Sequence, residues 1–162
     1  IHVIRDGRDG AVSGWHHVKR DTPEEARKQF PTFADYVASF AKQWAETTQL
    51  GRDFGHHHPE QYFEVRYEDL HADMETHLAR LLNFLGVDAS PETIARCREH
   101  GSFRKLSGGR APGEEDKQSH FRKGVVGDWR EFFDKKSLAV FEREAGRVLK
   151  DLGYGQGDKV RG

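Results

Sequence analysis

The chain has 162 residues, a length that allows one domain with a single hydrophobic core. Its 26 lysines and arginines nearly balance 27 aspartates and glutamates, which excludes a protein that binds nucleic acid through bulk positive charge. No apolar run approaches the roughly 20 residues that cross a bilayer, so we expect no membrane segment in this chain. Any anion site must therefore be a local cluster of arginines and lysines.

The first half of the chain predicts one strand followed by helices. Residues 1–4 are apolar and end at the Gly-containing turn 5–10, as a buried strand does at the carboxyl edge of a parallel sheet. A helix can open within residues 11–17, and the capping box 22–25 predicts a short helix. A longer helix begins near residue 32 and should end at Gly51. Its expected core-facing residues are Phe33, Val37, Phe40 and Trp44.

The second half predicts one more strand among helices. Aromatic and β-branched residues make 62–67 the second strand, and leucines at helical spacing predict a helix over 74–85 that ends before Gly86. Ser90 and Pro91 should start the next helix. Residues 102–128 are expected to form a long charged loop of the kind that is usually functional or disordered. A final amphipathic helix, capped by Ser137, should run to residue 152.

Histidine and cysteine residues suggest no metal or disulfide site. His56, His57 and His58 lie in a segment expected to be a solvated loop, and no second ligand set has a recognisable spacing. Cys97 is the one cysteine, which excludes an internal disulfide framework and fits a reducing, cytoplasmic compartment. We expect its side chain to be a small buried hydrophobe.

Three segments carry the residues that could bind an anion. In the first, Arg5 at a strand end and Ser13 in a following helix can converge on one anion beside free helical N–H groups. The second is Tyr67-Glu68-Asp69, where the two acids are expected to cap a helix rather than to act as a pair. The third contains Arg122 and Lys123 beside Gly124, which lets backbone N–H groups approach a ligand. Taken alone, Arg5 and Ser13 favour an exposed turn with a solvated arginine over an anion site.

Together, the three segments resemble those of the sulfotransferases that use 3′-phosphoadenosine 5′-phosphosulfate (PAPS). Arg5 and Ser13 stand eight positions apart, as in that family's 3′-phosphate motif. The run from Arg122 to Trp129 resembles the family's Arg-Lys-Gly loop with its following Gly-Asp-Trp, and Tyr67 lies between the two motifs in the family's order. The resemblance covers nearly the whole chain. It implies an α/β fold of the three-layer P-loop nucleotide-binding type with a parallel sheet.

The resemblance also implies which residues bind the nucleotide. By it, Arg5 and Ser13 would hold the 3′-phosphate, and the loop residues Arg122, Lys123 and Gly124 would close over it. Tyr67 and Phe103 would contact adenine, with the base stacking on the Phe103 ring. The family's Thr-Ser-Phe adenine site reads Gly101-Ser102-Phe103 here, so one side-chain hydrogen bond to adenine is missing.

Other family features have no match in the chain. The Lys-containing phosphosulfate loop and the usual His or Glu base are absent, so no catalytic residue is assigned. Residues 133–139 lack the family's dimer pattern. His16 and His17, with Trp15, either contact the acceptor or simply pack. Two short strands make a poor sheet by themselves. We therefore expect residues 1–162 to be the carboxyl-terminal portion of one domain, with the fold incomplete and an upstream segment supplied in cis or by a second chain.

The implied function is transfer of a sulfuryl group from PAPS to a hydroxyl or amine, which leaves adenosine 3′,5′-bisphosphate (PAP). The acceptor would be a small molecule, a glycan or a peptide, and no metal is implied. The 162 residues alone are expected to be inactive. The alternative is a non-catalytic fragment or pseudoenzyme that binds PAP. An ATP-dependent kinase is disfavoured because two basic segments are assigned to a 3′-phosphate that ATP lacks.

Overall fold

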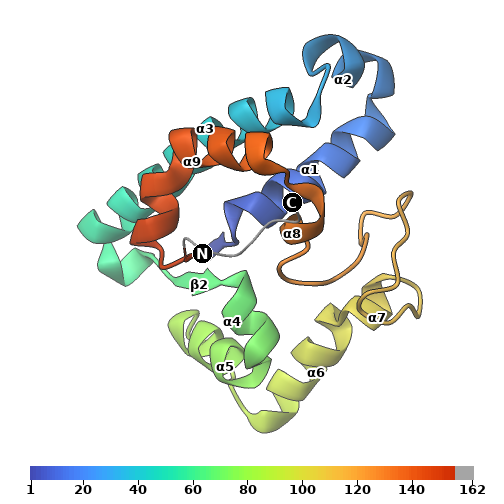
Figure 1. Ribbon diagram of the computed structural model, residues 1–162. Coiled ribbons are helices and arrows are strands. Elements are labelled where there is room, and N and C mark those ends of the chain that lie inside the picture. The colour runs from blue at the N-terminus through green and yellow to red at the C-terminus, as the bar shows by residue number, and fades with distance from the viewer. Residues whose placement is uncertain (156–162) are drawn as a thin grey trace. The chain divides into compact units, whose positions relative to one another are not determined.

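The computed structural model describes residues 1–155, which form two compact units. The first unit comprises residues 1–5 and 55–126, and the second comprises residues 6–54 and, of the described residues, 127–155. In chain order the elements are β1 (His2–Ile4), α1 (Gly7–Asp21), α2 (Pro23–Gln29), α3 (Phe33–His57), the 3-10 turn η1 (Pro59–Gln61), β2 (Glu64–Arg66), α4 (Tyr67–Ala72), α5 (Met74–Phe84), α6 (Pro91–Gly101), α7 (Phe103–Leu106), α8 (Trp129–Phe132) and α9 (Lys135–Asp151) (Figure 1).

The first unit is built on a parallel pair of strands. β1 and β2 pair in the register that sets Val3 opposite Val65. The Tyr62 hydroxyl lies 2.7 Å from His2 Nδ1 and donates to the Glu64 carboxylate at 2.8 Å, which ties both strands at one end. Helices α4, α5, α6 and α7 follow in succession after β2 (Figure 1). The expectation of an α/β fold with a parallel sheet is confirmed, and β2 is shorter than predicted because Tyr67 already begins α4.

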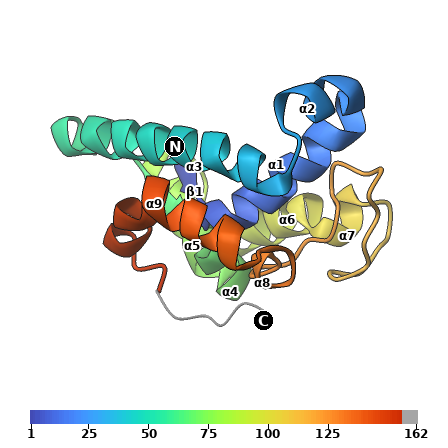
Figure 2. The same cartoon turned by 45° about the horizontal axis from the view of Figure 1, so that its top comes forward.

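The second unit has a helical core. Val12 from α1, Val37 from α3 and Phe141 from α9 are fully buried in one apolar cluster. Figure 2 shows α3 and α9 side by side. The predicted stripe on α3 is confirmed as core, since Phe33, Phe40 and Trp44 pack against the same cluster.

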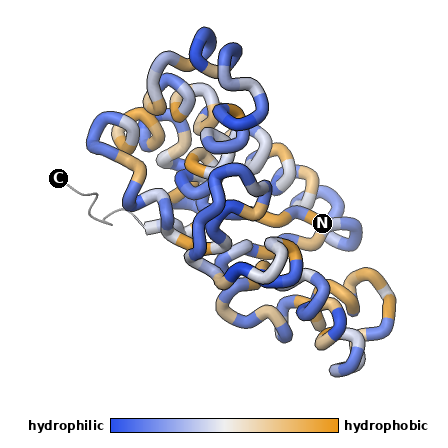
Figure 3. The backbone as a smooth tube through the Cα atoms, turned by 90° about the vertical axis from the view of Figure 1, so that its right-hand side faces the viewer, coloured by the Kyte–Doolittle hydropathy of each residue, from blue (hydrophilic) through white to orange (hydrophobic). Residues whose placement is uncertain are grey.

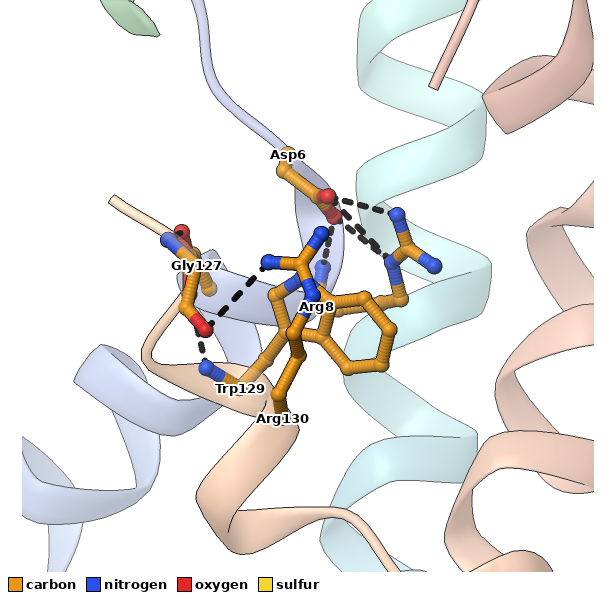
Figure 4. Close-up of polar contacts among 6 residues, drawn as sticks. Asp6, Arg8, Gly127, Trp129 and Arg130 are labelled. Carbon is orange, nitrogen blue, oxygen red and sulfur yellow. Dashed lines mark hydrogen bonds and ion pairs between the residues drawn. The ribbon is translucent and has the colours of Figure 1, made fainter. Parts of the chain in front are cut away.

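Buried charged side chains surround the N-terminus of α1 in the second unit. Asp6 caps the helix, accepting from the Arg8 backbone N–H at 2.9 Å and from the Arg8 guanidinium at 2.7 Å (Figure 4). Asp9, only 1% exposed, accepts from the backbone N–H groups of Gly127 and Trp129 at 2.6 and 2.9 Å. This carboxylate fixes the start of α8 to α1, and the Trp129 side chain is buried at 1% exposure.

The sequence predictions for the end of α3 and for the burial of Cys97 are wrong. Helix α3 does not end at Gly51 but continues to His57, so His56 and His57 lie in its last turn and not in a loop. A glycine within a helix costs only about 1 kcal/mol, which the long core-facing stripe outweighs. Cys97 is exposed on α6 and not buried, because it lies on the solvent side of that helix.

The helix caps also differ in detail from the sequence patterns. Helix α2 begins after Thr22 as predicted, but the Thr22 hydroxyl donates back to the Val18 carbonyl and forms no capping box. Ser90 caps α6 as expected. At α9, Asp134 is the cap and Ser137 is its capping-box partner three residues later.

The polar composition is visible along the backbone, where hydrophilic residues interrupt most of the apolar stretches (Figure 3). None of the helices within residues 1–155 combines the length and apolar character that a membrane-spanning helix requires.

Candidate functional site

Arg5 connects the end of β1 to two distant segments of the first unit. Its guanidinium carbon lies 4.6 Å from the centre of the Tyr67 ring at the start of α4. Its Nη2 donates to the carbonyl of Val125 at 3.1 Å. Arg5, Tyr67 and Val125 are all half-buried, so the cation is held while part of its surface still faces solvent.

Tyr67 is held in turn by His71, one helical turn further along α4. The Tyr67 hydroxyl oxygen and His71 Nε2 are 2.8 Å apart, and the two rings are 4.6 Å apart. Burial lowers the pKa of His71, the positive charge of Arg5 lowers it further, and Glu68 partly opposes both. The neutral imidazole is therefore favoured beside Arg5. Glu68 and Asp69 lie in the first turn of α4, but the prediction that they cap this helix is wrong, because Arg66 holds the N-cap position and no side-chain cap forms.

Phe103 and Gly124 meet so closely that only glycine fits. Gly124 has φ +65°, in the left-handed region, and a Cβ added to it would lie 2.3 Å from Phe103 Cδ2. Both conditions exclude a larger residue. Phe103 begins α7, so this contact joins the Arg-Lys-Gly segment to the residue that was expected to stack on adenine.

Arg110 organises the segment that precedes Arg122. Its guanidinium donates to three backbone carbonyls, those of Glu114 at 2.8 Å, Phe121 at 2.6 Å and Arg122 at 2.9 Å. It also lies 5.4 Å from the centre of the Phe103 ring. One side chain thus braces both ends of residues 114–122. Arg110 is a site residue that the sequence patterns did not identify.

Arg122 and Lys123 are held by backbone hydrogen bonds across this segment. The Arg122 carbonyl accepts from Asp116 N–H at 3.0 Å, and the Lys123 carbonyl accepts from Gly113 N–H at 2.8 Å. The Arg122 side chain is 11% exposed and pairs with Glu115 at 2.5 Å. The loop therefore has a defined conformation around its two cations.

The structure brings six of the seven expected residues into the first unit: Arg5, Tyr67, Phe103, Arg122, Lys123 and Gly124. Ser13 belongs to the second unit, where it is half-buried on α1. Its contribution to the site stays a prediction. Within residues 1–155, no three His, Cys, Asp or Glu side chains gather as metal ligands.

Comparison with known proteins identifies the family. Residues 1–153 match the family described as the sulfotransferase domain. The chain belongs to the sulfotransferase domain family. It is 28% identical to cytosolic sulfotransferase 3 of Arabidopsis thaliana, over 93% of this chain and 53% of that protein. It is 25% identical to mouse (Mus musculus) sulfotransferase 1E1, over 93% of this chain and 55% of that protein.

Two solved structures share the fold. The chain is similar to a mouse sulfotransferase, SULT7A1, complexed with PAP, at TM-score 0.68 and 24% identity, covering 94% of this chain and 61% of that one. It is also similar to a retinol dehydratase in complex with androsterone and the inactive cofactor PAP, at TM-score 0.70 and 27% identity, covering 92% of this chain and 46% of that one. The chain spans about half the length of the curated relatives it matches.

Proposed function

We propose that this chain forms the nucleotide-recognition part of a PAPS-dependent sulfotransferase. The observation that carries the proposal is the cluster in the first unit, where Arg5 contacts both Tyr67 and the loop carbonyl beside Gly124. Arg5 thus joins three distant parts of the sequence in a half-buried surface that carries a cation and an aromatic ring. Such a surface suits a ligand with an aromatic base and a phosphate.

In this function the chain's residues bind and orient the donor. Arg5, Arg122 and Lys123 supply cationic donors for the 3′-phosphate, with Ser13 adding a hydroxyl, and the glycine at 124 lets the backbone approach the ligand. Tyr67 and Phe103 provide ring surfaces for adenine. Fixing the nucleotide contributes to rate through positioning, because the reacting sulfuryl group is then held in line with the acceptor.

The proposal extends to the whole reaction and fold. PAPS donates the sulfuryl group to a hydroxyl or amine of a small-molecule, glycan or peptide acceptor, and PAP is the product. The fold is then the three-layer P-loop type, with residues 1–162 forming the carboxyl-terminal portion of one domain. The Lys-containing phosphosulfate loop and the base would come from residues outside these 162, in cis or on a second chain. The cytosolic names of the Arabidopsis relatives support a cytoplasmic location.

The 3′-phosphate provides the decisive test. Charge-assisted hydrogen bonds contribute roughly 1.5–3 kcal/mol each, less where solvent reaches them, and they are not additive. A combined loss of about 4 kcal/mol corresponds to nearly a thousandfold in affinity at about 1.4 kcal/mol per decade. Titration calorimetry at fixed salt should therefore show PAP binding nearly a thousandfold more tightly than AMP.

Two variants localise the effect. Arg122→Ala should weaken PAP and leave AMP almost unchanged, whereas Arg143→Ala, which removes the same charge from an exposed site on α9, should change neither. If PAP and AMP bind the wild-type protein within about threefold of each other, well under one decade, the phosphate assignment is wrong. With the segment that carries the phosphosulfate loop and the base supplied in cis or as a second chain, PAP binding without sulfuryl transfer to any acceptor tested would instead favour the non-catalytic alternative.

A further inference from the structure

One contact in the first unit has no role in the proposed binding scheme. The Glu115 carboxylate pairs with the Arg122 guanidinium at 2.5 Å, and the two side chains are 31% and 11% exposed. Arg122 is a residue expected to receive the 3′-phosphate. The same guanidinium that should bind an anionic ligand therefore already holds an anion from its own chain.

The backbone places Glu115 opposite Arg122. Two hydrogen bonds cross the segment, from Gly113 N–H to the Lys123 carbonyl and from Asp116 N–H to the Arg122 carbonyl. Glu115 lies between these two cross-links. Arg110 braces the same stretch through the carbonyls of residues 114, 121 and 122. The pair is thus set by the conformation of the loop and not by two freely moving side chains.

The neighbouring acids are engaged elsewhere. Glu114 Oε2 accepts from the Ala111 N–H at 2.8 Å, and Asp116 Oδ1 accepts from the Gln118 N–H at 2.9 Å. Both carboxylates stabilise local turns. Glu115, the middle one of the three consecutive acids, contacts the guanidinium of Arg122.

We propose that Glu115 is an internal competitor for the phosphate site on Arg122. This inference rests on the proposed function. A carboxylate and a phosphate are both anions that bind guanidinium N–H donors, so the 3′-phosphate competes with Glu115 for Arg122. The apparent affinity for the nucleotide is then the intrinsic affinity reduced by the fraction of protein in which Arg122 is released. Glu115 thereby lowers the affinity for PAP.

The competition predicts that removing the charge of Glu115 increases the affinity for PAP. Glu115→Gln removes the charge but keeps the size of the side chain, so PAP should bind about fivefold more tightly, as expected for loss of one partly exposed ion pair. AMP lacks the 3′-phosphate and should bind the variant and the wild type equally. Glu115→Ala should reproduce the gain without any hydrogen-bonding group at that position.

A matched control is available in the adjacent residue. Glu114→Gln makes the same charge change one position away, and its amide oxygen can still accept from Ala111 N–H. PAP affinity should stay near that of the wild type, which separates a specific effect from a general loss of negative charge. In an Arg122→Ala background, Glu115→Gln should give no gain, because the group it competes for is gone.

Calorimetric titration with PAP and AMP compares the wild type with Glu115→Gln, Glu115→Ala, Glu114→Gln and the Arg122→Ala/Glu115→Gln double variant, the last against Arg122→Ala alone. These titrations test the competition separately from the proposed function. Equal or weaker PAP binding by Glu115→Gln and Glu115→Ala, in a protein that still prefers PAP to AMP, would overturn the competition and leave the proposed function standing. A gain of equal size in Glu114→Gln would overturn it too. If the wild-type protein does not prefer PAP, the proposed function itself is wrong.

Discussion

The two units hold their arginines in different ways. In the second unit, Arg8 is only 4% exposed, two of its guanidinium nitrogens contact the Asp6 carboxylate, and the guanidinium lies 3.8 Å from the centre of the Trp129 ring (Figure 4). In the first unit, Arg5 is half-buried and contacts the Tyr67 ring and the Val125 carbonyl, and Arg122 contacts the more exposed Glu115. A buried pair is costly to separate, whereas a partly exposed one exchanges readily. Burial thus distinguishes charges that hold the fold from charges that can receive a ligand.

The largest expected effect concerns the buried charges of the second unit. Asp9→Ala leaves the N–H groups of Gly127 and Trp129 without their acceptor, so we expect a loss of about 3 kcal/mol or more in the free energy of unfolding. Urea denaturation followed by circular dichroism measures it. Arg122→Ala, in the ligand-accessible group, should cost less than about 1 kcal/mol. Similar losses for the two variants would erase the distinction.

Gly124 tests how tightly the ligand-binding side is packed. Gly124→Ala combines a left-handed φ with a Cβ 2.3 Å from the Phe103 ring, so PAP affinity should fall at least about tenfold. Gly108→Ala is the control, because its φ is +76° but nothing lies within 4 Å of an added Cβ. Its PAP affinity should change by less than about threefold. An equal loss in both would mean that backbone strain alone matters.

A smaller effect concerns the brace inside the loop. Arg110→Ala removes three hydrogen bonds to carbonyls, and we expect the amides of Gly113 and Asp116 to exchange about fivefold faster with solvent. Hydrogen exchange with mass spectrometry or NMR reports this. Arg104→Ala, an exposed neighbour on α7, should leave those amides unchanged. Unaltered exchange in Arg110→Ala would show that the two cross-loop bonds suffice.

The smallest effect is a pH dependence from His71. Because its pKa in the folded protein is lowered from the usual 6.5, the unfolded chain binds a proton more readily. The stabilising contribution is complete above pH 6.5 and is lost as the pH falls through the lowered pKa. His71→Gln should flatten this part of the stability curve, measured as urea midpoints between neutral and mildly acidic pH. His100→Gln, at an exposed position of α6, should leave it intact.

Local patterns in the sequence predicted what depends on neighbours in the chain. The start of α6 at Ser90, the stripe on α3 and the short strand before Arg5 all follow from spacing and capping. The end of α3 and the exposure of Cys97 could not be predicted from spacing and capping, because tertiary packing decides them.

Local sequence patterns likewise predicted some residues of the candidate site and not others. Arg5, Arg122 and Gly124 stand out because their residue types and order are unusual. Arg110 gave no signal, since its partners are backbone carbonyls that every residue possesses. Glu115 is one of three consecutive acids, and only the path of the loop sets it against Arg122. Asp9 was likewise missed, because its donors lie 118 and 120 positions away.

The distribution of tryptophans allows the unfolding of the second unit to be followed separately by fluorescence. All three tryptophans, Trp15, Trp44 and Trp129, belong to the second unit, while Tyr62 and Tyr67 belong to the first. Tryptophan emission therefore follows the unfolding of the second unit, whereas the circular dichroism of helices follows both. If the two signals change at different urea concentrations, the units unfold as separate cooperative blocks, and if they coincide, they unfold as one. The protein thus needs no added label for its two parts to be observed separately.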